Sequence, residues 1–244
     1  MGNRPSRRQR QAAQIKETAP VSNLRNQDPE YDQQSLVDGL MSISNYLSKK
    51  KHKVMIVAVG GAVSTILLQS RQSTHDFDFF AENLNPKTSA ALRKAVEKAT
   101  LQSQVLRQGW LNNQTTVFLT PDKRRLLTEQ AIVQNEVVFA STSLTVLAAP
   151  WGYAFCSKLH RLSGARNQTK GTDIEDAVVY VRKYLETKKT VSVRMEEIQE
   201  LCGDYSISIE WRDETVDVLD ELNEAYKQKF GVTEDATTVT WLDY

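Results

Sequence analysis

The chain has 244 residues, 40% of them hydrophobic and 25% charged, and its formal net charge is +1. This is the composition of an ordinary globular protein, and the near-neutral charge gives no general argument for binding to nucleic acid or to an anionic membrane surface. No apolar run approaches the roughly 20 residues that span a bilayer, so we expect no membrane partner.

The first half of the chain alternates apolar segments with turn signals. Residues 1–30 are polar and basic and bury too little apolar surface to order themselves, so we expect a disordered tail. Apolar residues recur at helical spacing over 36–47, and the continuous apolar run at 54–59 predicts a strand buried on both faces. A glycine pair ends that strand, and residues 62–68 have the pattern of a helix.

Further elements complete a mixed α/β core. Proline at the first helical position marks the start of a helix at Asn85-Pro86. We expect strands at 76–81, 115–119, 135–140 and 144–148, and a short helix at about 124–133.

After Pro150 the pattern becomes helical. A helix is predicted at 151–163, and Thr172-Asp173-Ile174-Glu175 has the form of a capping box at the start of another. Two more helices are expected near 193–202 and 209–229. The fold class is therefore α/β (α+β): a tail at 1–30, a mixed-sheet core at 31–150, a helical region at 151–230 and a tail at 231–244.

The cysteine usage and the N-terminus bear on location. Cys156 and Cys202 lie far apart without CxxC spacing, which suits free thiols in a reducing compartment. The start of the chain lacks the apolar core of a secretory signal. We expect an intracellular, cytoplasmic protein, and the basic N-terminus is also compatible with the nucleus.

Asp76 and Asp78 stand one residue apart in the predicted strand, within the stretch STHDFDFF. Side chains alternate faces in a strand, so the two carboxylates lie on one face, about 7 Å apart at Cβ, while Phe77 and Phe79 enter the core. Two neighbouring carboxylates repel each other, and a divalent cation held by hard oxygen ligands, such as Mg²⁺, relieves that repulsion. The alternative is a strand with a polar, solvent-facing side.

Gly60 and Gly61 separate the buried strand from the following helix. Backbone N–H groups at such a junction can bind an anion, since no side chain blocks the approach. A tight strand-to-helix turn needs the same glycines and is the alternative.

Taken in order, VGGAV and RQSTHDFDFF resemble the signature of the minimal nucleotidyltransferase fold shared with DNA polymerase β, and most closely that of the nucleotidyltransferase-like toxins of type IV toxin–antitoxin systems. The resemblance covers about residues 54–185. It implies that a glycine loop holds the phosphates of a nucleotide and that the Asp-x-Asp pair holds Mg²⁺. The matching positions are Gly60, Gly61, Arg71, Thr74, Asp76 and Asp78.

The resemblance also implies residues downstream. A third acidic residue is expected on a neighbouring strand, and Glu136 fits that place, with Asp122 as the alternative. Lys158 would meet the nucleotide phosphates, and Asp173 would assist the site unless it only stabilises the first turn of its helix. Ser64 would join the glycines in holding the β- and γ-phosphates.

The sequence therefore predicts a Mg²⁺-dependent nucleotidyltransferase that uses an NTP, releases pyrophosphate and modifies a hydroxyl acceptor in a protein, RNA or small molecule. The alternative is a catalytically inactive nucleotide-binding or protein-interaction module on the same fold. The expected catalytic and metal-binding residues are Asp76, Asp78 and Glu136, and the expected nucleotide-binding residues are Gly60, Gly61, Ser64, Arg71, Thr74, Lys158 and Asp173.

Overall fold

The buried strand predicted at 54–59 is the centre of the sheet. A computed structural model describes residues 29–164, 171–231 and 242–243, and in it β2 (Val54–Val59) lies in the middle of a five-stranded sheet of order β5-β4-β2-β7-β6. β2 pairs antiparallel with β4 and parallel with β7, so the sheet is mixed. The α/β fold class predicted from the sequence is confirmed. The other strands of the sheet are β4 (Phe77–Phe80), β5 (Leu111–Asn112), β6 (Val137–Ala140) and β7 (Leu144–Ala148).

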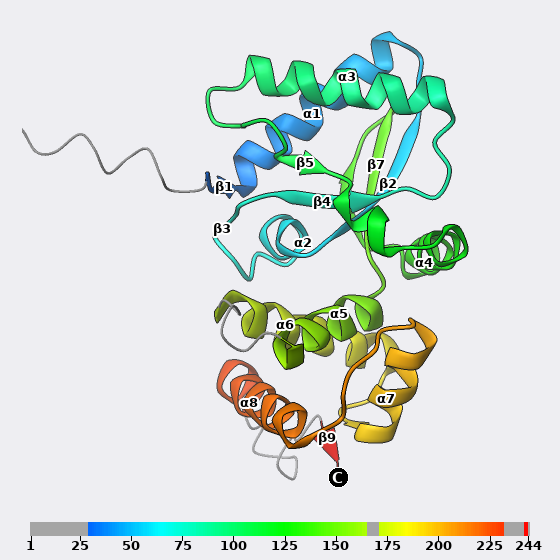
Figure 1. Ribbon diagram of the computed structural model, residues 1–244. Coiled ribbons are helices and arrows are strands. Elements are labelled where there is room, and N and C mark those ends of the chain that lie inside the picture. Colours follow the sequence, from blue (N-terminus) through cyan, green and yellow to red (C-terminus); the bar gives the residue numbers. More distant parts are fainter. Residues whose placement is uncertain (1–28, 165–170, 232–241, 244) are drawn as a thin grey trace, which may run out of the picture.

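Two long helices cover the sheet in the upper part of Figure 1, where they pack against each other. α1 (Gln33–Lys49) begins at Asp32, whose carboxylate accepts the N–H of Ser35 at 2.8 Å. α3 (Pro86–Gln102) begins as predicted, with the Asn85 side chain as cap and proline at the first position. The apolar faces of α1 and α3 cover one face of the sheet.

The helical region lies on the other side of the sheet, in the lower part of Figure 1. Its first helices pack against each other, and Trp151 stacks on Tyr180 with ring centroids 5.9 Å apart. α2 (Gly61–Ile66) lies between the sheet and this region, and the buried apolar side chains of both halves form one continuous core. The helices of the region are α5 (Trp151–Gly164), α6 (Gly171–Lys188), α7 (Met195–Asp204) and α8 (Asp213–Phe230).

One predicted strand is wrong. Residues 115–119 were expected to be extended, but Gln114–Phe118 form a 3₁₀ helix, η2. The β-branched residues of this stretch favour a strand, but the Asn112 side chain accepts the N–H of Gln114 at 3.1 Å and turns the chain away from the sheet directly after β5. The next helix, α4 (Pro121–Gln134), begins before the predicted residue 124 because Thr120 caps it.

The remaining differences concern short strands and the chain ends. β1 (Tyr31–Asp32) pairs with β3 (Ser73–Thr74), and β8 (Val193–Arg194) pairs with β9 (Leu242–Asp243). β9 falls within residues 231–244, which the sequence predicted as a tail, and β8 falls at the start of the helix predicted near 193–202. Most of both predicted tails lies outside the described residues. None of the described helices is long and apolar enough to cross a membrane.

Candidate functional site

The strand register brings the Asp-x-Asp pair next to the glycine pair. Asp78 in β4 is the direct partner of Val59 in β2, and Val59 is followed at once by Gly60. Phe77 and Phe79 are buried, Asp78 is half-buried and Asp76 is exposed, as period-two alternation predicts. The carboxylate pair and the glycine loop therefore lie at the same end of two neighbouring strands.

Asp78 has an unusual electrostatic environment. Burial, and secondly the charge of Asp76, raise the pKa of the Asp78 carboxyl to about 6, while a hydrogen bond from Asn112 and the charges of Arg161 and Lys158 act in the opposite direction. Asn112 is the direct partner of Asp78 on β5. Because Arg161 and Lys158 belong to α5, the carboxylates lie on the side of the sheet that faces the helical region.

Glu136 does not take the place predicted for a third carboxylate. Its carbonyl accepts the N–H of Ala148 on β7, at the start of β6. Since β2 and β7 separate β6 from β4, Glu136 stands about 14 Å from the Asp-x-Asp strand at about 4.8 Å per strand. The residue that faces Asp78 on the neighbouring strand β5 is Asn112, whereas an acidic residue was expected on a neighbouring strand.

The alternative third carboxylate, Asp122, is also elsewhere. It lies in the first turn of α4, is exposed and pairs with Arg125 at 3.4 Å. Among the residues that the structure describes, no three His, Cys, Asp or Glu side chains form a metal-binding group. The Asp-x-Asp pair brings two carboxylates to the site, whereas the side-chain oxygen of Asn112 already accepts the N–H of Gln114.

Gly60 and Gly61 are each required in the structure, for different reasons. Gly60 has φ 69° and ψ −146°, a conformation that L side chains rarely adopt. A Cβ on Gly61 would clash with Thr74 Oγ1 and with Arg71 Nη1. Gly61 is therefore required for the close packing of these two side chains, and its Cα surface is not open to a ligand as the sequence suggested.

Two predicted phosphate ligands are structural instead. Ser64 is fully buried, and its hydroxyl bonds that of Tyr180 at 2.9 Å, so it cannot reach a bound phosphate. Thr74 is buried against Gly61, and its hydroxyl donates to the main-chain oxygen of Asp76 at 3.2 Å. Thr74 thus fixes the turn that leads into the carboxylate strand.

A buried charge network joins the loop after α2 to the helical region. Lys158 Nζ lies 2.6 Å from Asp173 Oδ1 and 2.7 Å from Asp176 Oδ2. Arg71 pairs with Asp176 at 3.2 Å, and Arg161 pairs with Asp173 at 3.2 Å. The side chains of this network are at most 12% exposed, except for Arg161, which is 57% exposed. Arg161 is therefore the cation of the network that a ligand in solvent can reach.

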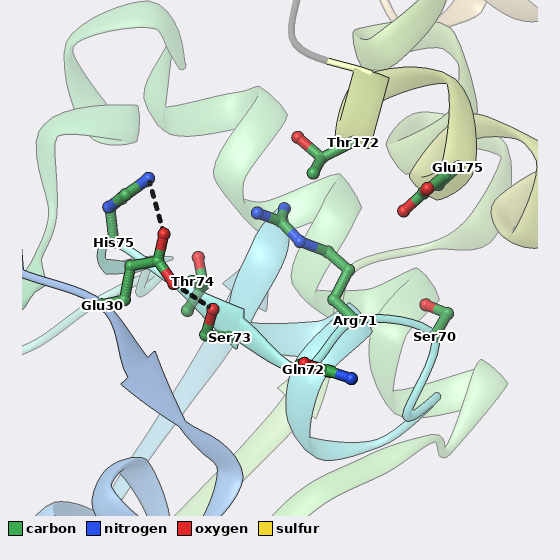
Figure 2. A pocket seen from close by; sticks show the side chains of 9 residues that line it. All are labelled: Glu30, Ser70, Arg71, Gln72, Ser73, Thr74, His75, Thr172 and Glu175. Atoms are coloured by element: carbon green, nitrogen blue, oxygen red, sulfur yellow. Dashed lines mark hydrogen bonds and ion pairs between the residues drawn. The ribbon is translucent and has the colours of Figure 1, made fainter.

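Figure 2 shows a small polar pocket beside this network, with a volume of about 260 Å³. Arg71 extends into it, and Thr172 and Glu175 of α6 lie above the Arg71 side chain in this view. On the opposite wall Glu30 accepts a hydrogen bond from Ser73 at 2.7 Å. Arg71 is held between the two halves of the chain, which favours a positioning role over direct phosphate binding.

The structure thus brings Arg71, Lys158 and Asp173 together but adds residues that sequence reasoning did not assign. Asp176 and Tyr180 follow Asp173 at positions i+3 and i+7 on one face of α6, and this spacing was a usable signal. The position of Asn112 beside Asp78 could not be predicted from a local sequence pattern, because it depends on the pairing of β5 with β4.

Comparisons with known proteins give a family but no activity. A family model matches residues 29–233, and its description is "Domain of unknown function (DUF7582)". No curated protein and no solved structure matches the chain. The resemblance to nucleotidyltransferases stays a prediction.

Proposed function

We propose that this chain, which belongs to the DUF7582 family of domains of unknown function, binds a Mg²⁺-bound nucleoside triphosphate at Asp76 and Asp78 and transfers its nucleotidyl group to a hydroxyl acceptor. The observation that carries the proposal is the register that pairs Asp78 with Val59. This register places Asp76 and Asp78 beside the loop between β2 and α2. They lie on the face of the sheet toward α5, which carries Lys158 and Arg161.

The residues present fit a magnesium ion. Mg²⁺ is commonly bound by one or two carboxylates together with waters and substrate phosphates, and it does not need a closed cage of protein ligands. Burial and the charge of Asp76 raise the pKa of Asp78, so the ionised form of Asp78 is destabilised and a bound cation would stabilise it. Asp76 and Asp78 would hold the ion, which when bound would neutralise charge on the phosphates.

Arg161 is the residue best suited to meet the phosphate chain. Its side chain is 57% exposed and is anchored by Asp173 at 3.2 Å, so it is oriented without being covered. Lys158 is 11% exposed and shared by two carboxylates, so its part is to hold the helical region against the loop. This assignment differs from the sequence prediction, in which Lys158 met the phosphates.

Hydrogen bonds fix the backbone of the glycine loop beside the carboxylates. The carbonyl of Gly60 is held by Val63 N–H at 3.0 Å and by the Tyr180 hydroxyl at 2.8 Å, so the loop is fixed before a ligand arrives. Such preorganisation lowers the cost of binding.

In the proposed reaction, the acceptor oxygen forms a bond to the α-phosphorus while the bond to pyrophosphate breaks. The hydroxyl proton passes to solvent or to an ionised carboxylate of the pair. Catalysis of this kind depends mainly on positioning and on charge neutralisation.

A second candidate is a nucleotide-binding module without turnover. Two observations favour it: Asn112 stands where a third carboxylate was expected, and Glu136 lies on the far side of β2 and β7. This module would bind the Mg²⁺-bound nucleotide at the same residues and leave it intact.

The experiment measures pyrophosphate release and label transfer from each of the four α-³²P-labelled NTPs, using the full chain with Mg²⁺ and a panel of acceptors. The panel contains the chain itself, bulk tRNA and small hydroxyl compounds. Asp78→Asn abolishes transfer if the proposal holds, whereas Asp122→Asn, an exposed carboxylate on α4, leaves it unchanged.

Calorimetry with each NTP separates the two candidates. Mg²⁺-dependent binding that Asp78→Asn removes, without any release of pyrophosphate, supports the binding module. Wild-type chain that binds no NTP in the presence of Mg²⁺ contradicts both.

A further inference from the structure

A second and larger pocket lies between the sheet domain and the helical region. Its volume is about 720 Å³, which is within the usual range for small-molecule sites. η2 and the start of α4 form one wall, and α5 with the loop after α7 forms the other. We call it the basic pocket and define it by Phe118, Lys123, Tyr153, Ser157, His160 and Arg161.

The charged side chains of the basic pocket are cationic. Lys123 and Arg161 line it, and none of the described residues that line it is acidic. Within residues 29–164 and 171–231, Lys123 forms no ion pair, and burial lowers the pKa of its ammonium group. An anionic group bound here would offset that burial cost.

The pocket also offers an aromatic platform and neutral polar groups. Phe118 is 82% exposed, so its ring is open to a ligand, and Tyr153 is buried in the opposite wall. His160 Nδ1 lies 2.8 Å from the main-chain oxygen of Ser208, so Nδ1 carries the hydrogen and Nε2 stays available. A ligand with a flat ring and an anionic group fits this combination.

Arg161 connects the basic pocket with the Asp-x-Asp pair. It lines the pocket, and its charge also acts on Asp78. η2, which carries Phe118, contacts β4, the strand that carries Asp78. The pocket, which α5 also lines, is therefore on the side of the sheet that carries the carboxylates.

We propose that the basic pocket binds the acceptor of the transfer reaction and that this acceptor is a nucleotide, either free or at the 3′ end of an RNA strand. The ring of the base packs on Phe118, and the phosphate contacts Lys123. A ribose hydroxyl then forms the bond to the α-phosphorus of the NTP, pyrophosphate leaves and the hydroxyl proton is released. The acceptor role rests on the proposed function, while binding of the nucleotide in the pocket does not.

The test is calorimetry of the full chain without Mg²⁺, with AMP as one probe and a five-nucleotide RNA bearing a 3′-hydroxyl as the other. Phe118→Ala and Lys123→Ala each weaken binding about tenfold, through loss of stacking and of a charge-assisted contact. Matched controls leave it unchanged: Val117→Ala, since Val117 is 83% exposed on the same 3₁₀ helix but does not line the pocket, and Lys94→Ala on the distant helix α3.

The outcomes separate this proposal from the proposed function. Binding of AMP and RNA is measured without Mg²⁺ and without an NTP, so a chain that shows no nucleotidyl transfer does not affect the present test. Tighter binding of RNA than of AMP assigns the strand end, and equal binding assigns the free nucleotide. Binding that Phe118→Ala and Lys123→Ala do not weaken, or its absence at about 1 mM of either probe, overturns the proposal.

Discussion

Tyr180 in α6 donates its hydroxyl hydrogen to the main-chain oxygen of Gly60 at 2.8 Å, although the two residues are 120 positions apart in the chain. Since that hydrogen is used, the hydroxyl of Ser64 is the donor in its 2.9 Å bond to Tyr180. Burial raises the pKa of Tyr180, so the hydroxyl keeps its hydrogen at all ordinary pH values. The helical region thus holds the glycine loop in a shape that only glycine readily adopts.

Replacing Tyr180 with phenylalanine removes both bonds and leaves the Ser64 hydroxyl buried without its partner. We expect the free energy of unfolding to fall by about 1–3 kcal/mol and NTP affinity to fall with it. Denaturant titration and calorimetry measure the two effects. Tyr46→Phe, at a residue on α1 whose hydroxyl forms no side-chain bond in the described part, is the matched control and stays within about 0.5 kcal/mol of wild type. Equal stability of both variants would refute the role given to Tyr180.

The buried charge network predicts a large difference between two neighbouring carboxylates of α6. Asp176 is fully buried against Lys158 and Arg71, while Glu175 is exposed. Asp176→Ala leaves Arg71 without its carboxylate partner and Lys158 with Asp173 alone, and it is expected to cost about 3–5 kcal/mol. Glu175→Ala is expected to cost less than about 0.5 kcal/mol.

A double variant checks that the cost comes from unpaired charge. Lys158→Met combined with Asp176→Leu removes charges of both signs, so its loss of stability should be smaller than the sum of the two single losses. Additive losses in chemical denaturation would show that the two side chains are not coupled.

A side chain at position 61 is expected to disturb the packing, and a second substitution should partly restore it. Gly61→Ala drives a methyl group into Thr74 and Arg71 and is expected to cost about 1–3 kcal/mol. Adding Thr74→Ala in the same chain relieves one of the clashes and recovers part of the loss. Gly203→Ala at the end of α7, where a Cβ meets nothing within 4 Å, is neutral or slightly stabilising. If Gly61→Ala melts at the same temperature as Gly203→Ala, the close packing at Gly61 is wrong.

The raised pKa of Asp78 predicts a pH-dependent stability in metal-free buffer. The folded chain holds the Asp78 proton up to about pH 6, whereas the unfolded chain releases it near pH 3.8. Between these values the folded state binds more protons, so this group lowers the free energy of unfolding as pH rises from about 4 to about 6. Asp78→Asn removes the effect and should be more stable than wild type by about 1–3 kcal/mol at pH 7, with little gain at pH 4.

Asp76 provides the internal check on that prediction. Its charge is the second cause of the raised pKa, so the stability gained by Asp78→Asn should shrink when Asp76→Asn is already present. Urea titrations at pH 4, 5, 6 and 7 give all the values. A gain that is the same at every pH would contradict the assignment of the shift to Asp78.

The sequence predicted those features of the site that depend on short-range pattern. Alternation within β4 placed Phe77 in the core and Asp78 on the other face. The apolar run ending at a glycine pair predicted the buried strand β2, in which Met55 is nevertheless exposed. Both follow from rules that act over a few residues.

Features that depend on pairing between distant segments were predicted wrongly or not at all. Glu136 was expected on a strand next to the one that carries Asp76 and Asp78, but the strand order places β2 and β7 between β6 and β4. Asn112 and Tyr180 reach the site only through pairing of β5 with β4 and packing of α6 on α2. Glycine at position 61 was interpreted as open space for a ligand, whereas the side chain of Thr74 fills that space.

The central claim is that Asp76 and Asp78 hold the metal of a metal-bound nucleotide, and a crystal structure of the full chain with Mn²⁺ and a non-hydrolysable NTP tests it most directly. Mn²⁺ replaces Mg²⁺ at oxygen ligands and is located by its anomalous signal. We predict an anomalous peak against both carboxylates, with the nucleotide phosphates between it and Arg161. A nucleotide bound elsewhere, or a peak absent from the pair in crystals that contain the nucleotide, would contradict the claim.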